Sequence, residues 1–376
     1  MARARAAAAE IEAPPEADRL EGFPHPRETT VLVGHEGAER TLAEALAGGR
    51  THHAWLIAGP PGIGKATLAY RFARAALAEP SERSTRSLAI ADDTRAARQV
   101  RALSHPGLLV IRRPWDDKAK RFAQSIPVDE VRKLRTFLSH SAAQDAWRIV
   151  IVDDANELNV NAANALLKSL EEPPPRTVFL LVASAPGRLL PTIRSRCRTL
   201  SLPPLASEAL RAAASHALQA VDKDTPASSD WPKLERLAEG SVGRLLGLWQ
   251  SGGLELYERI AKLTAGLPRV DWRVVHALSD ELQPAAAQPR FELFFELLLA
   301  VLARLIRAQA AGEGAADEQE LARRLIGEER LASFAGLWER IGRNKAETLA
   351  LNLDRKALVL ETVGALAAAA RNGKPA

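Results

Sequence analysis

A glycine-rich loop that ends in a lysine is the part of this sequence best suited to chemistry. It reads Gly59-Pro60-Pro61-Gly62-Ile63-Gly64-Lys65. In loops of this kind the glycines let backbone N–H groups point at phosphate oxygens, and the lysine neutralises the β- and γ-phosphates of a nucleotide. The pattern therefore predicts phosphate binding by Gly59, Gly62, Gly64 and Lys65.

The residue after the lysine departs from the usual pattern. A serine or threonine hydroxyl normally stands there and holds magnesium, whereas this chain has Ala66. Thr67 comes one residue later, which is a turn of about 100° along a helix, so its hydroxyl cannot simply take over. We keep Thr67 as a candidate nucleotide contact, and we expect magnesium-dependent hydrolysis to be weak or absent.

Two neighbouring aspartates, Asp153 and Asp154, end an apolar run that begins at Arg148. In proteins that hydrolyse ATP with such a loop, the first acid orients magnesium and the second is a glutamate that polarises water. Asp154 is one methylene shorter than glutamate, so a base role there would need a different geometry. The alternative is that both acids only cap a strand end, and the loss of the hydroxyl at Ala66 keeps that alternative open.

Three further positions carry candidate functional side chains. Arg196 lies in the run Arg194-Ser195-Arg196-Cys197-Arg198, which could be a solvated basic face or could present an arginine to the γ-phosphate of a neighbouring subunit. Arg244 follows Gly240 and Ser241, where ordinary helix capping competes with a role in sensing phosphate. Ser184 ends an apolar run and is more simply explained as a structural serine.

These side chains need a sheet to position them. Apolar runs at 53–58, 108–111, 148–153 and 177–183 predict strands, and helical spacing follows the loop at Leu68, Phe72 and Ala76. Asn161 is expected to cap a helix that Pro173 stops. Strands that alternate with helices predict an α/β domain with a parallel sheet. No strand pattern occurs after Pro203, and helical patterns run from Leu254 to about Ala370.

Composition limits the class of protein. The chain has 376 residues, a net charge of +5 and one cysteine, Cys197. A single cysteine excludes disulfides and a cysteine-based zinc site within the chain, and it favours a reducing cytoplasm. Residues 1–23 lack an apolar signal core and are expected to form a disordered tail, and residues 80–101 an irregular insertion. The longest apolar run carries charges, so no membrane span is expected.

The motifs together resemble the delta-prime subunits of the bacterial DNA polymerase III clamp loader, a family of AAA+ proteins. The resemblance is carried by the loop Gly59 to Lys65, by the block Asn161-Ala162-Ala163-Asn164-Ala165-Leu166-Leu167-Lys168-Ser169-Leu170-Glu171-Glu172-Pro173-Pro174, and by Thr192 to Arg198. The second block is the most specific. The motifs cover residues 30 to 245.

The resemblance implies an AAA+ P-loop domain over 24–203, a helical lid domain over 204–250 and an all-helical collar domain over 251–376. It also implies that Arg196 is an arginine finger acting in trans, that Asp153 and Arg244 contact nucleotide, and that the ligand is ATP or ADP. The implied partners are the gamma/tau motor subunits, the delta subunit, and, through the complex, the sliding clamp and primed DNA.

The departures from the family pattern favour a stator subunit over a motor subunit. Motor subunits have a hydroxyl after the loop lysine, a glutamate in the acidic motif and four zinc-binding cysteines, whereas this chain has Ala66, Asp154 and no such cysteines. No zinc is therefore expected. Two alternatives stay open: an active AAA+ ATPase, such as a motor subunit or a helicase-like remodeller, and a scaffold that binds no nucleotide.

Overall fold

The computed structural model describes residues 15–49, 51–139 and 146–371. Within it the chain divides into two compact units, one up to Gly247 and one from Leu248 onward. The division of the first unit into the ranges 24–203 and 204–250 stays a prediction. No helix in the described ranges is long and apolar enough to cross a membrane.

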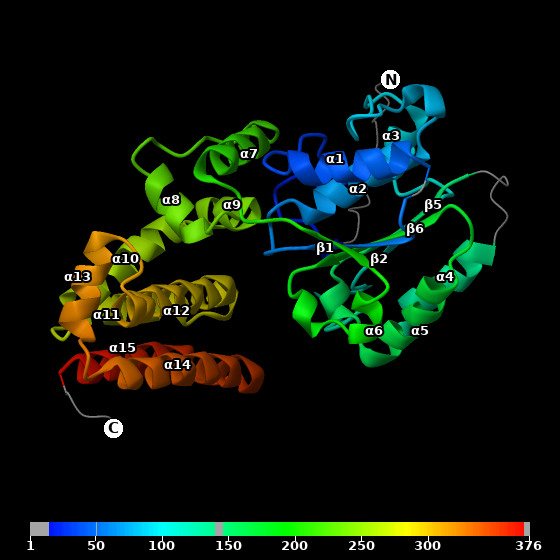
Figure 1. Cartoon of the computed structure of the whole chain (residues 1–376). Helices are drawn as coiled ribbons and strands as arrows, with labels where there is room; N and C mark the ends of the chain where they lie inside the picture. The colour runs from blue at the N-terminus through cyan, green and yellow to red at the C-terminus, as the bar shows by residue number, and fades with distance from the viewer. Residues whose placement is uncertain (1–14, 50, 140–145, 372–376) are drawn as a thin grey trace, which may run out of the picture. The chain divides into compact units, whose positions relative to one another are not determined.

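A parallel five-stranded sheet forms the centre of the first unit (Figure 1). Its strand order is β2-β5-β6-β1-β7. The strands are β1 (Ala54–Ala58), β2 (Leu108–Ile111), β5 (Arg148–Val152), β6 (Thr177–Ala183) and β7 (Arg198–Ser201). The central strands β1 and β6 are buried along their whole length, as expected for a parallel sheet covered on both faces. The predicted α/β class and the four predicted strands are confirmed.

Helices cover both faces of this sheet (Figure 1). One face packs on α1 (Glu36–Ala47), α2 (Lys65–Leu77) and α3 (Arg95–Arg101), and the other on α4 (Val128–Ser139), α5 (Val160–Glu171) and α6 (Pro191–Arg194). Alternate residues of each strand enter opposite cores, so that Trp55 and Ile57 of β1 face α2 while Leu56 faces α5. Short strands β3 (Trp115–Asp116) and β4 (Arg121–Phe122) form a separate antiparallel pair.

The remaining elements are helical. In the first unit α7 (Ser207–Gln219) and α8 (Trp231–Ala238) follow the sheet, and α9 (Val242–Gln250) contains the boundary between the units. The second unit holds α10 (Gly253–Gly266), α11 (Trp272–Leu282), α12 (Gln288–Ala311), α13 (Ala316–Leu325), α14 (Leu331–Leu351) and α15 (Arg355–Arg371). Its long helix α12 packs against α13 and α14 and buries three phenylalanines, Phe291, Phe294 and Phe295. The predicted loss of strands after Pro203 is confirmed for the described residues.

Three local predictions were wrong. The insertion at 80–101 is not wholly irregular, because Thr94 caps α3 by accepting a hydrogen bond from the Ala97 N–H. The cap of α5 is Asn159, which accepts from the Ala162 N–H at 2.8 Å, and Asn161 lies inside the helix. Strand β7 was missed because its residues are polar and largely exposed at the sheet edge.

The predicted tail needs a larger correction. Residues 1–14 lie outside the described residues, but residues 15–23 pack on the first unit. Phe23 is buried, and Asp18 lies 2.9 Å from the buried ring of His25 and 2.7 Å from the guanidinium of Arg112. Glu16 pairs with the guanidinium of Arg27 at 2.7 Å. Residues 15–23 are therefore held by ion pairs. The prediction of disorder failed because it considered only the low apolar content of the segment.

Candidate functional site

The glycine-rich loop lies between β1 and α2, in the strand–loop–helix arrangement that phosphate binding requires. Gly59 has φ +154° and Gly62 has φ +73°, conformations that residues with a side chain rarely adopt. A Cβ on Gly59 would come within 2.4 Å of the Leu202 carbonyl oxygen, and a Cβ on Gly62 within 2.5 Å of the Ser241 hydroxyl. The glycines are therefore required both by the backbone path and by the closeness of neighbouring segments.

Lys65 is bound to the loop that precedes it. Its buried ammonium donates to the carbonyl oxygens of Gly59 at 2.7 Å and Pro60 at 2.6 Å, and to the Ser184 hydroxyl at 3.3 Å. Burial lowers its pKa, although the charges of Asp154 and Asp153 oppose the shift. To bind a phosphate, the ammonium would exchange these neutral acceptors for a charged one, which is a stronger type of hydrogen bond.

The side of the site that would hold magnesium does not fit that ion. Ala66 offers no oxygen, and Asp153 is buried, with a pKa that burial and the charge of Asp18 raise to about 8. A carboxylic acid that is mostly neutral at pH 7 is a poor ligand for a hard cation, which prefers charged oxygens. Among the described residues, no group of three or more acidic, histidine or cysteine side chains is arranged to hold a metal. The glycine cradle and Lys65 suit phosphate, whereas these residues do not suit magnesium.

Asp154 is occupied by a hydrogen-bond network between the ends of β5 and β6. Its carboxylate accepts from the Ser184 hydroxyl at 2.8 Å and from the Asn156 N–H at 2.9 Å. The Asn156 amide in turn accepts from the backbone N–H groups of Ser184 and Ala185 and donates to the Ala185 carbonyl at 2.7 Å. This network links Lys65 to Asp154 through Ser184. The sequence interpretation missed Asn156, and the only signal for it was its place just after the paired acids.

The start of α9 contacts the loop directly. The Ser241 hydroxyl donates to the Pro61 carbonyl at 2.8 Å, and the Gly243 N–H donates to the Gly62 carbonyl at 2.9 Å. Arg244 lies close by, and its guanidinium is 3.4 Å from Glu239. The structure thus brings the Gly240–Arg244 region to the loop, while the predicted contact of Arg244 with phosphate stays a prediction. The Thr67 side chain is half-buried, one residue beyond Ala66.

Arg196 belongs to a different part of the first unit. It follows α6, which covers the face of the sheet opposite to α2 (Figure 1). Its guanidinium donates to the Thr192 carbonyl at 2.8 Å and to the Glu171 carboxylate at 2.7 Å. About a third of its side chain (34%) is exposed to solvent. Arg198 behaves differently, because its guanidinium lies over the ring of Trp55, 5.0 Å from the centroid.

Comparison with known proteins shows that the chain is similar to subunits of DNA polymerase III. A family model described as DNA polymerase III, delta subunit, matches residues 34–206. The chain is 31% identical to DNA polymerase III subunit delta' of Pseudomonas aeruginosa over 75% of this chain and 82% of that protein. It is 32% identical to subunit delta' of Escherichia coli over 65% of this chain and 69% of that protein. It is 28% identical to subunit tau of E. coli over 88% of this chain but 46% of tau.

Proposed function

Because the chain belongs to the family of DNA polymerase III delta-prime subunits, we propose that it is the stator of a clamp loader. In this role it joins the gamma/tau motor subunits and the delta subunit in a ring that opens the sliding clamp and places it on primed DNA. The AAA+ domain over 24–203 and the lid over 204–250 form one interface of the ring, and the collar over 251–376 holds the ring together. A reducing cytoplasm is the expected compartment.

One observation carries the choice of stator over motor: of the two side chains expected to hold magnesium, the hydroxyl is absent and the acid is buried. Ala66 has no hydroxyl, and Asp153 is a buried acid with a pKa near 8. Without magnesium the γ-phosphate lacks the charge neutralisation on which phosphoryl transfer depends. The loop still suits the phosphates of ATP or ADP, with Gly59, Gly62, Gly64 and Lys65 as the binding residues and Arg244 as a further candidate contact.

The chain's contribution to hydrolysis is then Arg196, offered to a nucleotide on the adjacent subunit. Its position on the far side of the sheet from Lys65, together with its partial exposure, supports a role outside its own loop. An arginine that reaches the γ-phosphate of a neighbour neutralises charge in the transition state. In that state Arg196 would leave Glu171 and bind phosphate oxygens through its planar fork.

The competing function is an active AAA+ ATPase, and Lys65 in an otherwise intact glycine loop is the feature that favours it. ATPase rates of the purified chain, alone and combined with its gamma/tau and delta partners, separate the two functions. We expect negligible hydrolysis by the chain alone and robust hydrolysis by the complex. Turnover by the isolated chain at a rate typical of AAA+ motors, abolished by Lys65→Ala, would mean that the chain is itself a motor.

A further inference from the structure

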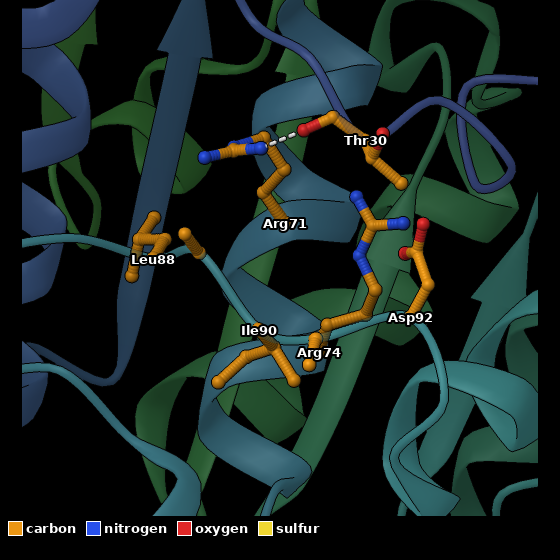
Figure 2. Close-up of a pocket in the computed structure, with 8 residues that line it drawn as sticks. Thr30, Arg71, Arg74, Leu88, Ile90 and Asp92 are labelled. Carbon is orange, nitrogen blue, oxygen red and sulfur yellow. Dashed lines mark hydrogen bonds between the residues drawn. The ribbon is translucent and has the colours of Figure 1, made fainter.

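A polar cavity lies away from the glycine-rich loop. It has a volume of about 280 Å³ and is lined by Thr30, by Arg71 and Arg74 of α2, and by residues 88–92. Figure 2 shows Arg71 and Arg74 on α2, the first reaching Thr30 and the second lying near Thr30 and Asp92. Arg74 stands nine residues after Lys65, which is about 14 Å along a helix, so this cavity is separate from the loop.

The charges of the two arginines are neutralised to different extents. Arg71 has a carboxylate partner, Glu39, at 2.7 Å. Arg74 is only 4% exposed, and its guanidinium donates to neutral acceptors, the carbonyl oxygens of Thr29 at 2.8 Å and Arg27 at 3.3 Å. Across the described parts of the chain, no carboxylate lies within 4.0 Å of Arg74, and Asp92 pairs instead with Arg101 at 3.4 Å.

A buried cation without an opposite charge is unusual, because removal of a charge from water is costly unless the charge is paired. Burial and the nearby charges of Arg71 and Arg101 lower the pKa of Arg74 to about 10, and the charge of Asp92 opposes this shift only in part. The Nε of Arg71 is also buried and has no hydrogen-bond acceptor among the described residues. The cavity therefore combines two arginines with one lining carboxylate, Asp92, a buried N–H that has no acceptor, and enough space for an ion.

We propose that this cavity binds a small oxyanion of the phosphate class, with Arg74 as its principal ligand and Arg71 beside it. Guanidinium groups match the oxygens of phosphate in a planar fork, and such charged hydrogen bonds are stronger than those to the carbonyls of Arg27 and Thr29. The bound ion supplies the missing counter-charge and ties α2 to the segment 88–92. The ion is either free phosphate or a larger species that carries a phosphoryl group.

The test is a calorimetric titration of the full chain with inorganic phosphate and, separately, with pyrophosphate. Chloride keeps the ionic strength constant. The chain carries Lys65→Ala, so that the glycine-rich loop does not contribute. We expect saturable binding of at least one anion. Arg74→Gln removes the charge but keeps a donor for the carbonyls, and it should weaken binding about tenfold or more. Arg98→Gln, an exposed arginine on α3, is the matched control and should leave binding unchanged.

A second variant keeps the proposal testable if Arg74→Gln does not fold. Ala91→Asp places a carboxylate at the wall of the cavity, which should raise the melting temperature in phosphate-free buffer and abolish anion binding. Tighter binding of pyrophosphate than of phosphate would identify a larger phosphorylated ligand, and equal binding would identify the free ion. Absence of saturable binding, or equal binding by the Lys65→Ala parent and by Ala91→Asp, would overturn the proposal.

Discussion

The guanidinium of Arg196 lies 2.7 Å from the carboxylate of Glu171 at the end of α5, and both side chains are partly exposed. The pair joins two of the three motifs that carry the family resemblance, since Glu171 lies in the block that ends at Pro174 and Arg196 lies in the arginine run. The carboxylate holds the arginine within its own domain. In the proposed trans-acting role, a neighbour's γ-phosphate displaces Glu171 as the partner of Arg196, because it carries more charge than a carboxylate.

This competition leads to a prediction for Glu171→Gln. An exposed ion pair contributes only about 0–1 kcal/mol to stability, so the melting temperature should change little. The ATPase rate of the assembled ring should stay equal to that of the wild type or rise, because Arg196 no longer has to leave a carboxylate. Steady-state ATPase assays on reconstituted rings measure this. A fall as deep as that caused by Arg196→Ala would mean that Glu171 orients the arginine during hydrolysis and does not compete for it.

The N-terminal segment gives a prediction about stability. Asp18 is almost completely buried between His25 and Arg112, and their charges together with the hydrogen bond from His25 outweigh burial, so the pKa of Asp18 lies below its usual value. Removal of one partner from a buried pair costs about 3 kcal/mol or more. Urea denaturation should therefore show that Asp18→Asn lowers the free energy of unfolding by this amount.

Glu21→Gln, at an exposed position of the same segment, is the control and should have no effect. Deletion of residues 1–14 should also leave stability unchanged, whereas deletion of residues 1–23 should destabilise the chain as Asp18→Asn does. Equal stability of the two deletion variants would show that the ion pairs of residues 15–23 contribute nothing measurable.

Asp153 makes stability depend on pH. Burial raises its pKa from 3.8 to about 8, so between these values the folded chain keeps a proton that the unfolded chain has lost. The free energy of unfolding should consequently fall as pH rises through this window, by on the order of 1 kcal/mol per pH unit. Asp153→Asn carries no titrating proton there and should remove this slope.

The measurement is urea denaturation at several pH values between about 5 and 8, with the wild type compared directly with Asp153→Asn so that other titrating groups cancel. Asp93→Asn, an exposed loop acid, should keep the wild-type slope. Parallel pH profiles for the wild type and Asp153→Asn would show that Asp153 is ionised in the folded chain, and the poor fit to magnesium would then rest on Ala66 alone.

The sequence predicted the central strands well because continuous apolar runs are strong local signals. Strands β1, β5 and β6 are almost completely buried, and so is the helix face that follows Lys65. Strand β7 escaped prediction because an edge strand needs few apolar residues and gains its hydrogen bonds from Trp55 to Ala58 of β1.

The contacts that shape the site were harder to predict because they join distant positions. Ser241 reaches Pro61 across 180 residues, and Asp18 reaches Arg112 across 94. Neither contact leaves a periodic or compositional trace, since one serine or one aspartate looks the same in a loop, a tail or a buried network. The motifs located Lys65 and Asp153, but only the fold shows that Lys65 is bonded to its own loop and that Asp153 is buried beside Asp18.

The most direct measurement for the stator role is the DNA-stimulated ATPase rate of the reconstituted ring with Arg196→Ala. The variant should fold and assemble, because the side chain is partly exposed and bonded only to Thr192 and Glu171 in the described structure. An arginine finger is worth about 10³–10⁵ in rate at one site, but the ring should lose less, because other interfaces keep their own fingers.

Arg196→Lys should rescue poorly, since an ammonium cannot reproduce the planar fork. Arg198→Ala is the matched control, because its guanidinium lies over Trp55 of its own domain. We predict a clear loss of ring ATPase with Arg196→Ala, little change with Arg198→Ala, and intact assembly with both variants. Equal losses from the two variants, or failure of the Arg196→Ala ring to assemble, would contradict this prediction.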